Sequence, residues 1–218
     1  MVRQLISIAA TCVGTRSLGP GLRSVAWVQG CPFRCPGCIA PDWIPARPGR
    51  RVTAANLAEA LLADPAVAGF TFSGGEPMQQ AGGLAEVIRL ARRRRDLTLL
   101  CFTGYRLAEL RARPPAPGVA ALLAETDVLI DGGYVAAKND DRGLRGSSNQ
   151  LIHHLTGRLA HAHAELAEGP RRAEIRLRGT SALLVGVPAR AVAEVFGRLG
   201  ERGEPDELPA EGTRSERQ

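Results

Sequence analysis

The sequence predicts an α/β fold in which parallel strands alternate with helices. Short apolar runs of strand length alternate with longer segments of helical periodicity. The chain has 218 residues, of which 44% are hydrophobic and 23% charged, so it can build one substantial core. Polar, glycine-containing segments repeatedly follow the predicted strands, and parallel α/β folds build their sites at that edge of the sheet.

Each predicted strand is a short apolar run that stops at a polar or glycine-containing segment. The run at 69–72 stops at Ser73-Gly-Gly-Glu-Pro77, and the run at 97–102 stops at Thr103-Gly104. In order along the chain, the predicted strands are Leu5–Ala10, Ser24–Val28, Gly69–Phe72, Leu97–Phe102 and Asp127–Asp131.

The predicted helices show apolar residues at three- and four-residue spacing. Thr53 is expected to cap the first helix, and Pro114-Pro-Ala-Pro117 cannot continue the third. Arg92–Arg95 is interpreted as a solvated helix C-terminus, where cations suit the helix dipole. The predicted helices are Thr53–Ala63, Gly83–Arg95, Tyr105–Arg113, Val119–Ala124 and Ala189–Leu199.

The last third of the chain carries weaker signals. Lys138–Asn149 is polar and predicts a loop, whereas Ile175–Leu177 and Leu183–Val187 predict a hairpin across Gly179-Thr-Ser181. After 200, glycine, proline and charged residues dominate. We therefore expect one domain over residues 1–200 and a disordered tail over 201–218.

The charge and the cysteines limit the class of protein. The net charge is +6, but the basic residues are almost all Arg, with Lys138 the single Lys, so we expect no nucleic-acid partner. Five cysteines, three of them crowded together, argue against a disulfide framework and for a reducing compartment. The apolar run at 5–10 is short for a signal peptide, and no run reaches the length of a membrane helix. We expect a cytoplasmic protein with no membrane partner.

Cys31, Cys35 and Cys38 are the most informative residues of the chain. They bring three thiols to one glycine- and proline-rich loop without a nearby fourth ligand. Iron–sulfur clusters are held by cysteine thiolates, normally four, and an open coordination position is typical of a catalytic site. The triad therefore predicts a cluster with one iron left free for a small molecule. A zinc site completed by a distant Cys12 or a His is the alternative, while Cys101, inside an apolar strand, is expected to behave as a small hydrophobe.

Ser73-Gly-Gly-Glu-Pro77 is the second chemistry-bearing segment. Consecutive glycines let backbone groups come close to a ligand, and Glu76 supplies a negative charge that could hold an ammonium group.

Together these segments resemble the radical S-adenosylmethionine (radical SAM) enzymes, and more narrowly the family that activates anaerobic ribonucleoside-triphosphate reductases. The resemblance covers about two-thirds of the chain. It rests on Gly19-Pro-Gly-Leu-Arg23, Cys31–Cys38, Phe102-Thr-Gly-Tyr105, and Asp131-Gly132 followed by Arg145-Gly-Ser-Ser-Asn-Gln150. It departs from the family's pattern at Ile39 and Ala40.

The resemblance implies a partial (β/α)6-type barrel of parallel strands with a short C-terminal addition. It also implies a 4Fe–4S cluster on the three cysteines, with its fourth iron chelated by S-adenosylmethionine, and no catalytic side chain beyond the cluster. The expected cofactor-binding residues are Gly74, Gly75, Glu76, Thr103, Asp131, Arg145, Ser147 and Asn149.

Several of these assignments have structural alternatives. Asp131 could position ribose hydroxyls or cap the strand end, and Arg145–Gln150 could contact the cofactor or form only a turn. His153 and His154 are interpreted as structural because they lack a metal-ligand spacing to the cysteines. His161 and His163 could lie on one face of a strand.

The expected activity is the reductive cleavage of S-adenosylmethionine to a 5′-deoxyadenosyl radical, which installs a glycyl radical on an anaerobic ribonucleotide reductase. The implied partners are that large glycyl-radical reductase and an electron donor such as flavodoxin or ferredoxin. Two other hypotheses remain: a radical SAM enzyme that modifies a small metabolite or peptide, and a non-catalytic zinc-binding protein.

Overall fold

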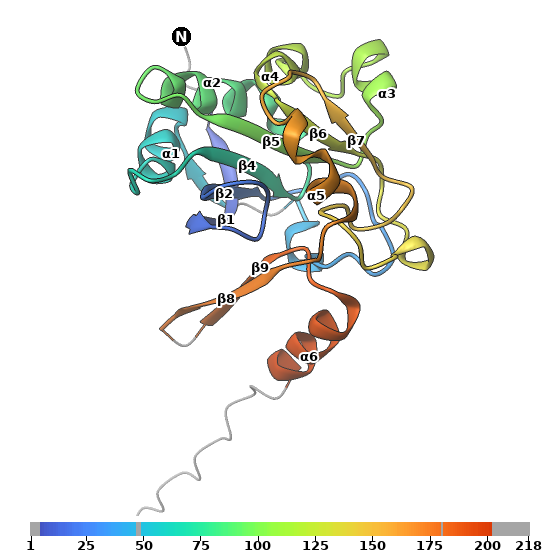
Figure 1. The fold of residues 1–218 in the computed structure, drawn as a ribbon. Coiled ribbons are helices and arrows are strands. Elements are labelled where there is room, and N and C mark those ends of the chain that lie inside the picture. Colours follow the sequence, from blue (N-terminus) through green and yellow to red (C-terminus); the bar gives the residue numbers. More distant parts are fainter. Residues whose placement is uncertain (1–4, 47–48, 180, 202–218) are drawn as a thin grey trace, which may run out of the picture.

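A computed structural model describes residues 5–46, 49–179 and 181–201 (Figure 1). The main feature is a seven-stranded sheet with the order β3-β1-β2-β4-β5-β6-β7, and a separate hairpin pairs β8 with β9. The sheet strands are β1 (Ile6–Thr15), β2 (Arg23–Val28), β3 (Arg50–Val52), β4 (Gly69–Gly74), β5 (Thr98–Thr103), β6 (Val128–Asp131) and β7 (Leu151–His154).

The four central strands, β2, β4, β5 and β6, run parallel to one another, which confirms the α/β prediction. β1 pairs antiparallel with β2, because the seven residues between them are too few for a parallel crossover. β3 and β7 were not predicted; they pair antiparallel with β1 and β6 and form the two edges of the sheet.

The helices that connect the parallel strands cover one face of the sheet. They are α1 (Ala54–Leu61), α2 (Ala81–Arg92), α3 (Leu107–Ala112) and α4 (Val119–Glu125) (Figure 1). Thr53 caps α1 as predicted, since its side chain accepts a hydrogen bond from the amide of Asn56 at 3.2 Å. Phe70 and Phe72 of β4 pack with Leu84 and Ile88 of α2 in the core on this face.

The opposite face is covered by the last third of the chain. Leu159, Ala162 and Leu166 pack on Leu100 and Ile130; Leu166 belongs to α5 (His163–Glu168). The predicted hairpin forms from β8 (Ala173–Arg178) and β9 (Ser181–Gly186). Val185 of β9 is fully buried against a group of residues from the first third of the chain, namely Cys12, Leu18, Val25 and Trp27.

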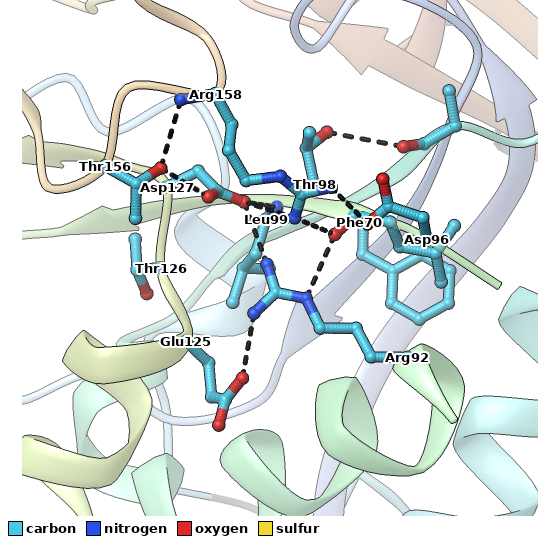
Figure 2. A network of polar contacts seen from close by, with 12 residues as sticks. Phe70, Arg92, Asp96, Thr98, Leu99, Glu125, Thr126, Asp127, Thr156 and Arg158 are labelled. Atoms are coloured by element: carbon cyan, nitrogen blue, oxygen red, sulfur yellow. Dashed lines mark hydrogen bonds and ion pairs between the residues drawn. The ribbon is translucent and has the colours of Figure 1, made fainter. Parts of the chain in front are cut away.

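A polar network ties the amino ends of the parallel strands together (Figure 2). Asp127, which is almost fully buried, accepts hydrogen bonds from Arg92 at 2.9 Å, from the amide of Leu99 at 2.8 Å and from Thr156 at 2.6 Å. Arg158 lies 3.6 Å from the same carboxylate. Arg92 is therefore partly buried and paired with a buried carboxylate, so the interpretation of Arg92–Arg95 as fully solvated is wrong for this residue.

Arg23 begins β2 and is completely buried. Its guanidinium donates to Thr71 at 2.8 Å, to Thr98 at 2.9 Å and to the carbonyl of Phe70. Burial lowers its pKa to about 10, while the charge of Asp127 acts in the opposite direction. Arg23 thus cross-links the first residues of three neighbouring strands.

The remaining predictions have mixed outcomes. His161 and His163 do not lie on a strand: His161 belongs to a 3-10 turn over Ala160–Ala162, and His163 is the first residue of α5. The last helix is α6 (Arg190–Glu201), so Glu201 is helical, and the rest of the predicted tail, 202–218, lies outside the described residues. The single domain over 1–200 stays a prediction. Among the residues that the structure describes, none of the helices is both long and apolar enough to cross a membrane.

Candidate functional site

The candidate site lies where the four parallel strands end. β2, β4, β5 and β6 are neighbours in the sheet, and the loops that follow them begin at their carboxyl ends. The amide of Gly75 donates to the carbonyl of Val28 at 2.8 Å, and the amide of Glu76 donates to the carbonyl of Gly30 at 2.9 Å. The amide of Gly132 donates to the carbonyl of Tyr105 at 3.0 Å. The four sequence segments that predicted a site are therefore joined at one edge of the sheet.

The three cysteines occupy the loop after β2. None is disulfide-bonded, and all three thiols are partly exposed. The amide of Cys38 donates to the carbonyl of Cys35 at 3.1 Å, which folds the loop back on itself. In the described part of the chain, no three His, Cys, Asp or Glu side chains group closely enough to hold one metal ion. Ligation by all three thiols therefore stays a prediction.

The packing of the chain requires glycine at positions 74 and 75, independently of any access for a ligand. Gly74 has a φ of +99°, and a Cβ there would lie 2.6 Å from the amide nitrogen of Val28. A Cβ on Gly75 would lie 2.2 Å from the carbonyl oxygen of Gly30. No side chain fits at either position, because the end of β4 passes directly against the start of the cysteine loop.

Glu76 and Thr103, both predicted to contact the cofactor, contact each other. The Glu76 carboxylate accepts hydrogen bonds from Thr103 Oγ1 at 2.8 Å and from the amides of Gly104 at 2.8 Å and Met78 at 2.9 Å. Its side chain is almost fully buried. Burial raises the pKa of Glu76 to about 7, although these hydrogen bonds favour the charged form. The cofactor role of both residues stays a prediction.

Asp131 is held by three partners at the end of β6. It accepts hydrogen bonds from the amide of Leu107 at 2.7 Å and from Arg106 Nη1 at 3.1 Å, and His153 Nε2 lies 2.8 Å away. Asp131 thus caps the start of α3. This is a structural role, similar to the strand-end cap that the sequence suggested as the alternative. His153 is the partner that the sequence did not identify, because the pairing of β7 with β6 was not predicted.

Arg145, Ser147 and Asn149 lie in a loop that packs against the segment after β6. Ser147 is fully buried and accepts a hydrogen bond from the amide of Val135 at 3.1 Å. Arg145 pairs with Asp140 at 2.8 Å. Asn149 Nδ2 donates to the carbonyl of Gly133 at 2.9 Å. Gln150, quoted in the motif but not assigned a role, fixes the loop by donating to the carbonyl of Gly132 at 2.6 Å.

Two observations test whether these residues fit a cluster with a bound small molecule. The donor set is three thiols, which suits iron–sulfur chemistry. Asn149 Oδ1 is buried and has no hydrogen-bond partner among the described residues. Asn149 Nδ2 is hydrogen-bonded to the carbonyl of Gly133, and a Cβ on Gly133 would lie 3.8 Å from Cys35 Sγ. A buried acceptor of this kind, on a side chain bonded to a residue beside a predicted ligand, is suited to a donor group of a bound molecule. The three cysteines and Asn149 therefore fit an iron–sulfur cluster that also binds a small molecule.

The surroundings of Cys31 and Cys38 favour the protonated thiols when no metal is bound. Burial, together with the nearby charges of Glu76, Cys38 and Cys35, raises the pKa of Cys31 to about 11, although a backbone hydrogen bond from Phe33 acts in the opposite direction. Burial also raises the pKa of Cys38. Thiolates bind metal, and a bound cation removes the proton that these surroundings favour.

Comparison with known proteins places the chain among iron–sulfur proteins. A family model described as "4Fe-4S single cluster domain" matches residues 17–153. The anaerobic ribonucleoside-triphosphate reductase-activating protein of Escherichia coli (strain K12) is 33% identical over 146 residues, which cover 63% of this chain and 91% of that relative. The protein of the same name from Enterobacteria phage T4 is 29% identical over 141 residues, covering 62% and 85%.

A second activating enzyme matches a shorter part of the chain. The pyruvate formate-lyase-activating enzyme of Clostridium pasteurianum is 36% identical over 92 residues, which cover 40% of this chain and 39% of that relative. The family model ends at residue 153, so α5, the β8–β9 hairpin and α6 lie beyond the part it matches.

Proposed function

Because the chain belongs to the 4Fe–4S activating enzymes of the radical SAM type, we propose that it cleaves S-adenosylmethionine reductively and installs a glycyl radical on an anaerobic ribonucleotide reductase. The observation that carries this proposal is the meeting of the cysteine loop, the Gly-Gly-Glu segment and the segments after β5 and β6 at one edge of the sheet. In this proposal, the sheet forms part of a (β/α)6-type barrel. The enzyme works in the cytoplasm and receives its electron from flavodoxin or ferredoxin.

The residues divide into those that hold the cluster and those that orient the nucleotide. Cys31, Cys35 and Cys38 would hold three irons, which leaves the fourth for the amino and carboxylate groups of S-adenosylmethionine. Glu76 would face the amino group, and a cation there would stabilise its ionised form against the burial that raises its pKa. Asn149 Oδ1, which has no partner, would accept a hydrogen bond from the bound molecule.

The cluster, held by Cys31, Cys35 and Cys38, would supply the electron for the reductive cleavage of S-adenosylmethionine, and this chemistry would remove a hydrogen atom from a glycine of the partner. The chain's own residues orient the nucleotide and exclude water. Gly74 and Gly75 bring the end of β4 against the cysteine loop, where the amides of Gly75 and Glu76 bond to the carbonyls of Val28 and Gly30.

The test combines cluster analysis with radical detection. Replacing any of Cys31, Cys35 or Cys38 by Ala is expected to abolish cluster binding and S-adenosylmethionine cleavage, measured as iron content and 5′-deoxyadenosine. Cys101→Ala is the matched control and should leave both largely intact, because Cys101 is buried in β5. A triad variant that retained turnover would contradict the ligand assignment.

The target is tested separately. Electron paramagnetic resonance of the reduced enzyme, mixed with S-adenosylmethionine and an anaerobic ribonucleotide reductase, should show a glycyl doublet. A silent spectrum with cluster and cofactor intact would rule out this target and favour a second candidate, a radical SAM enzyme acting on a small metabolite or peptide. That candidate is supported by Ile39 and Ala40, which depart from the family's pattern, and by the C-terminal part beyond the family match. Transfer of an isotopic label from such a substrate into 5′-deoxyadenosine would support it.

A further inference from the structure

Phe33 lies in the middle of the cysteine loop, and neither the cluster nor the nucleotide assignment gives it a role. It stands between Cys31 and Cys35 in the sequence, and its side chain is half-buried. Its ring meets Tyr105, in the segment after β5, edge-on, with the ring centroids 4.7 Å apart. Aromatic pairs of this geometry are favourable beyond the area that they bury. One side chain of the cysteine loop is therefore anchored on a different strand end.

Gly104 provides the surface on which this ring rests. A Cβ built on Gly104 would lie 2.5 Å from Phe33 Cδ2 and 2.6 Å from Cε2, and its three nearest neighbours are all atoms of this one ring. Gly104 has no positive φ, so glycine is required by the contact and not by the backbone conformation. Only a residue without a side chain lets the ring approach so closely.

The support for the ring is itself rigid. The amide of Gly104 donates to Glu76 Oε2 at 2.8 Å, and Glu76 also accepts from Thr103. The Tyr105 hydroxyl accepts a hydrogen bond from Gln79 Nε2 at 2.7 Å. Gly104 and Tyr105, the two residues that Phe33 contacts, are thus both held by hydrogen bonds to the segment after β4.

Gly37, at the other end of the cysteine loop, does not need to be glycine to avoid a steric clash. A Cβ on Gly37 would lie 3.5 Å from Ala136 Cβ and 3.6 Å from Tyr134 Cε1, which is ordinary van der Waals distance. The contact of Phe33 with Gly104 therefore differs from that of Gly37, because of these two glycines only Gly104 is placed so that an added methyl would overlap a neighbouring side chain.

We propose that Phe33, seated on Gly104 and Tyr105, is a positioning residue that fixes the cysteine loop so that its thiols face the cluster. The proposal rests on the cluster and not on the identity of the radical acceptor. Residues that orient metal ligands without binding the metal commonly change metal affinity by roughly 10- to 100-fold when removed.

The experiment uses the anaerobically reconstituted full chain and measures the rate of cluster loss to an iron chelator and the spectrum of the reduced cluster. Phe33→Ala should lose the cluster roughly tenfold faster than the wild type and should broaden the spectrum, while Phe33→Leu should restore much of the wild-type behaviour. Phe196→Ala, the same change on α6, is the matched control and should behave as the wild type. The urea midpoint of the cluster-free chain should fall only slightly in Phe33→Ala, because the ring is half-buried and its edge-on pair with Tyr105 adds only a small stabilisation. The chain should therefore stay folded under the conditions in which cluster loss is measured, which separates positioning from folding.

Gly104→Ala gives the sharper result. Its added methyl must displace the Phe33 ring, so this variant should lose the cluster as fast as Phe33→Ala does. The double variant should be no worse than Phe33→Ala alone, because the ring that the methyl would meet is gone. Wild-type cluster retention in Phe33→Ala, or a double variant whose defect equals the sum of the two, would overturn the proposal. A wild-type protein that holds its cluster but forms no glycyl radical would instead refute the proposed target and leave this comparison intact.

Discussion

At the scale of single residues, Glu76 shows how much the structure adds to a motif. Its place in a Gly-Gly-Glu segment was visible in the sequence, and the sequence suggested a negative charge that could hold an ammonium group. The structure buries the carboxylate and gives it three donors, with Thr103 and Gly104 on the next strand. The pairing of Glu76 with Thr103 depends on the alignment of β4 with β5. The two residues are 27 positions apart, so the sequence alone does not show that they meet.

The raised pKa of Glu76 predicts a pH dependence of stability. The pKa rises from 4.5 to about 7 in the folded chain, so between these values the folded chain holds a proton that the unfolded chain has released. The contribution of Glu76 to the free energy of unfolding should therefore be greatest below pH 4.5, fall as the pH rises to about 7, and stay level above it. The total loss should be at most about 3 kcal/mol.

Urea unfolding of the cluster-free chain between pH 5 and 7.5 measures this effect. Glu76→Gln should remove much of the decline, whereas Glu59→Gln, at a side chain that is 65% exposed, should leave it unchanged. Identical slopes for the wild type and Glu76→Gln would show that the group does not titrate in this range.

At the scale of elements, hydrophobic periodicity located most strands and helices, and the structure identifies what it could not locate. β3 is a three-residue strand of Arg50, Arg51 and Val52, and β7 contains two histidines. Such polar edge strands form through backbone pairing with a neighbour and carry little apolar signal of their own. The four loops at the site were predictable because each follows a buried parallel strand, whereas Phe33 and His153 act through contacts between strands.

The network around Asp127 predicts that the strand starts depend on one buried carboxylate (Figure 2). Asp127→Ala should reduce the free energy of unfolding by roughly 3 kcal/mol, because it leaves Arg92 and the amide of Leu99 without their partner. Asp96→Ala is the control: Asp96 also pairs with Arg158, but its side chain is 90% exposed, so little should change. Equal losses in urea unfolding would mean that burial does not decide the strength of these pairs.

At the scale of the whole molecule, the sheet is covered on its two faces by different parts of the chain. The helices that follow β3 to β5 cover one face, and α5 with the β8–β9 hairpin covers the other (Figure 1). The sequence predicted the hairpin but not where it packs, because Val185, which is fully buried, looks like any other strand valine.

The packing of the hairpin can be tested by one truncation of a side chain. Val185→Ala should cost about 2 kcal/mol of unfolding free energy, since it removes buried methyl groups from the contact with Val25 and Trp27. Leu177→Ala, on β8, should cost almost nothing because Leu177 is 78% exposed. A Val185→Ala variant as stable as the wild type would show that the hairpin does not contribute to the core.

The hairpin also sets the order in which the chain can complete its fold. The Thr15 hydroxyl donates to the carboxylate of Glu174, and Ser17 donates to the carbonyl of Val185, so these bonds join residues 159 and 168 positions apart. On the ribosome, β1 and β2 emerge before β9, so their apolar side facing Val185 has no cover until the hairpin has also been synthesised. Contacts between such distant residues form slowly, and the nascent protein therefore carries an uncovered apolar surface until the hairpin packs against it.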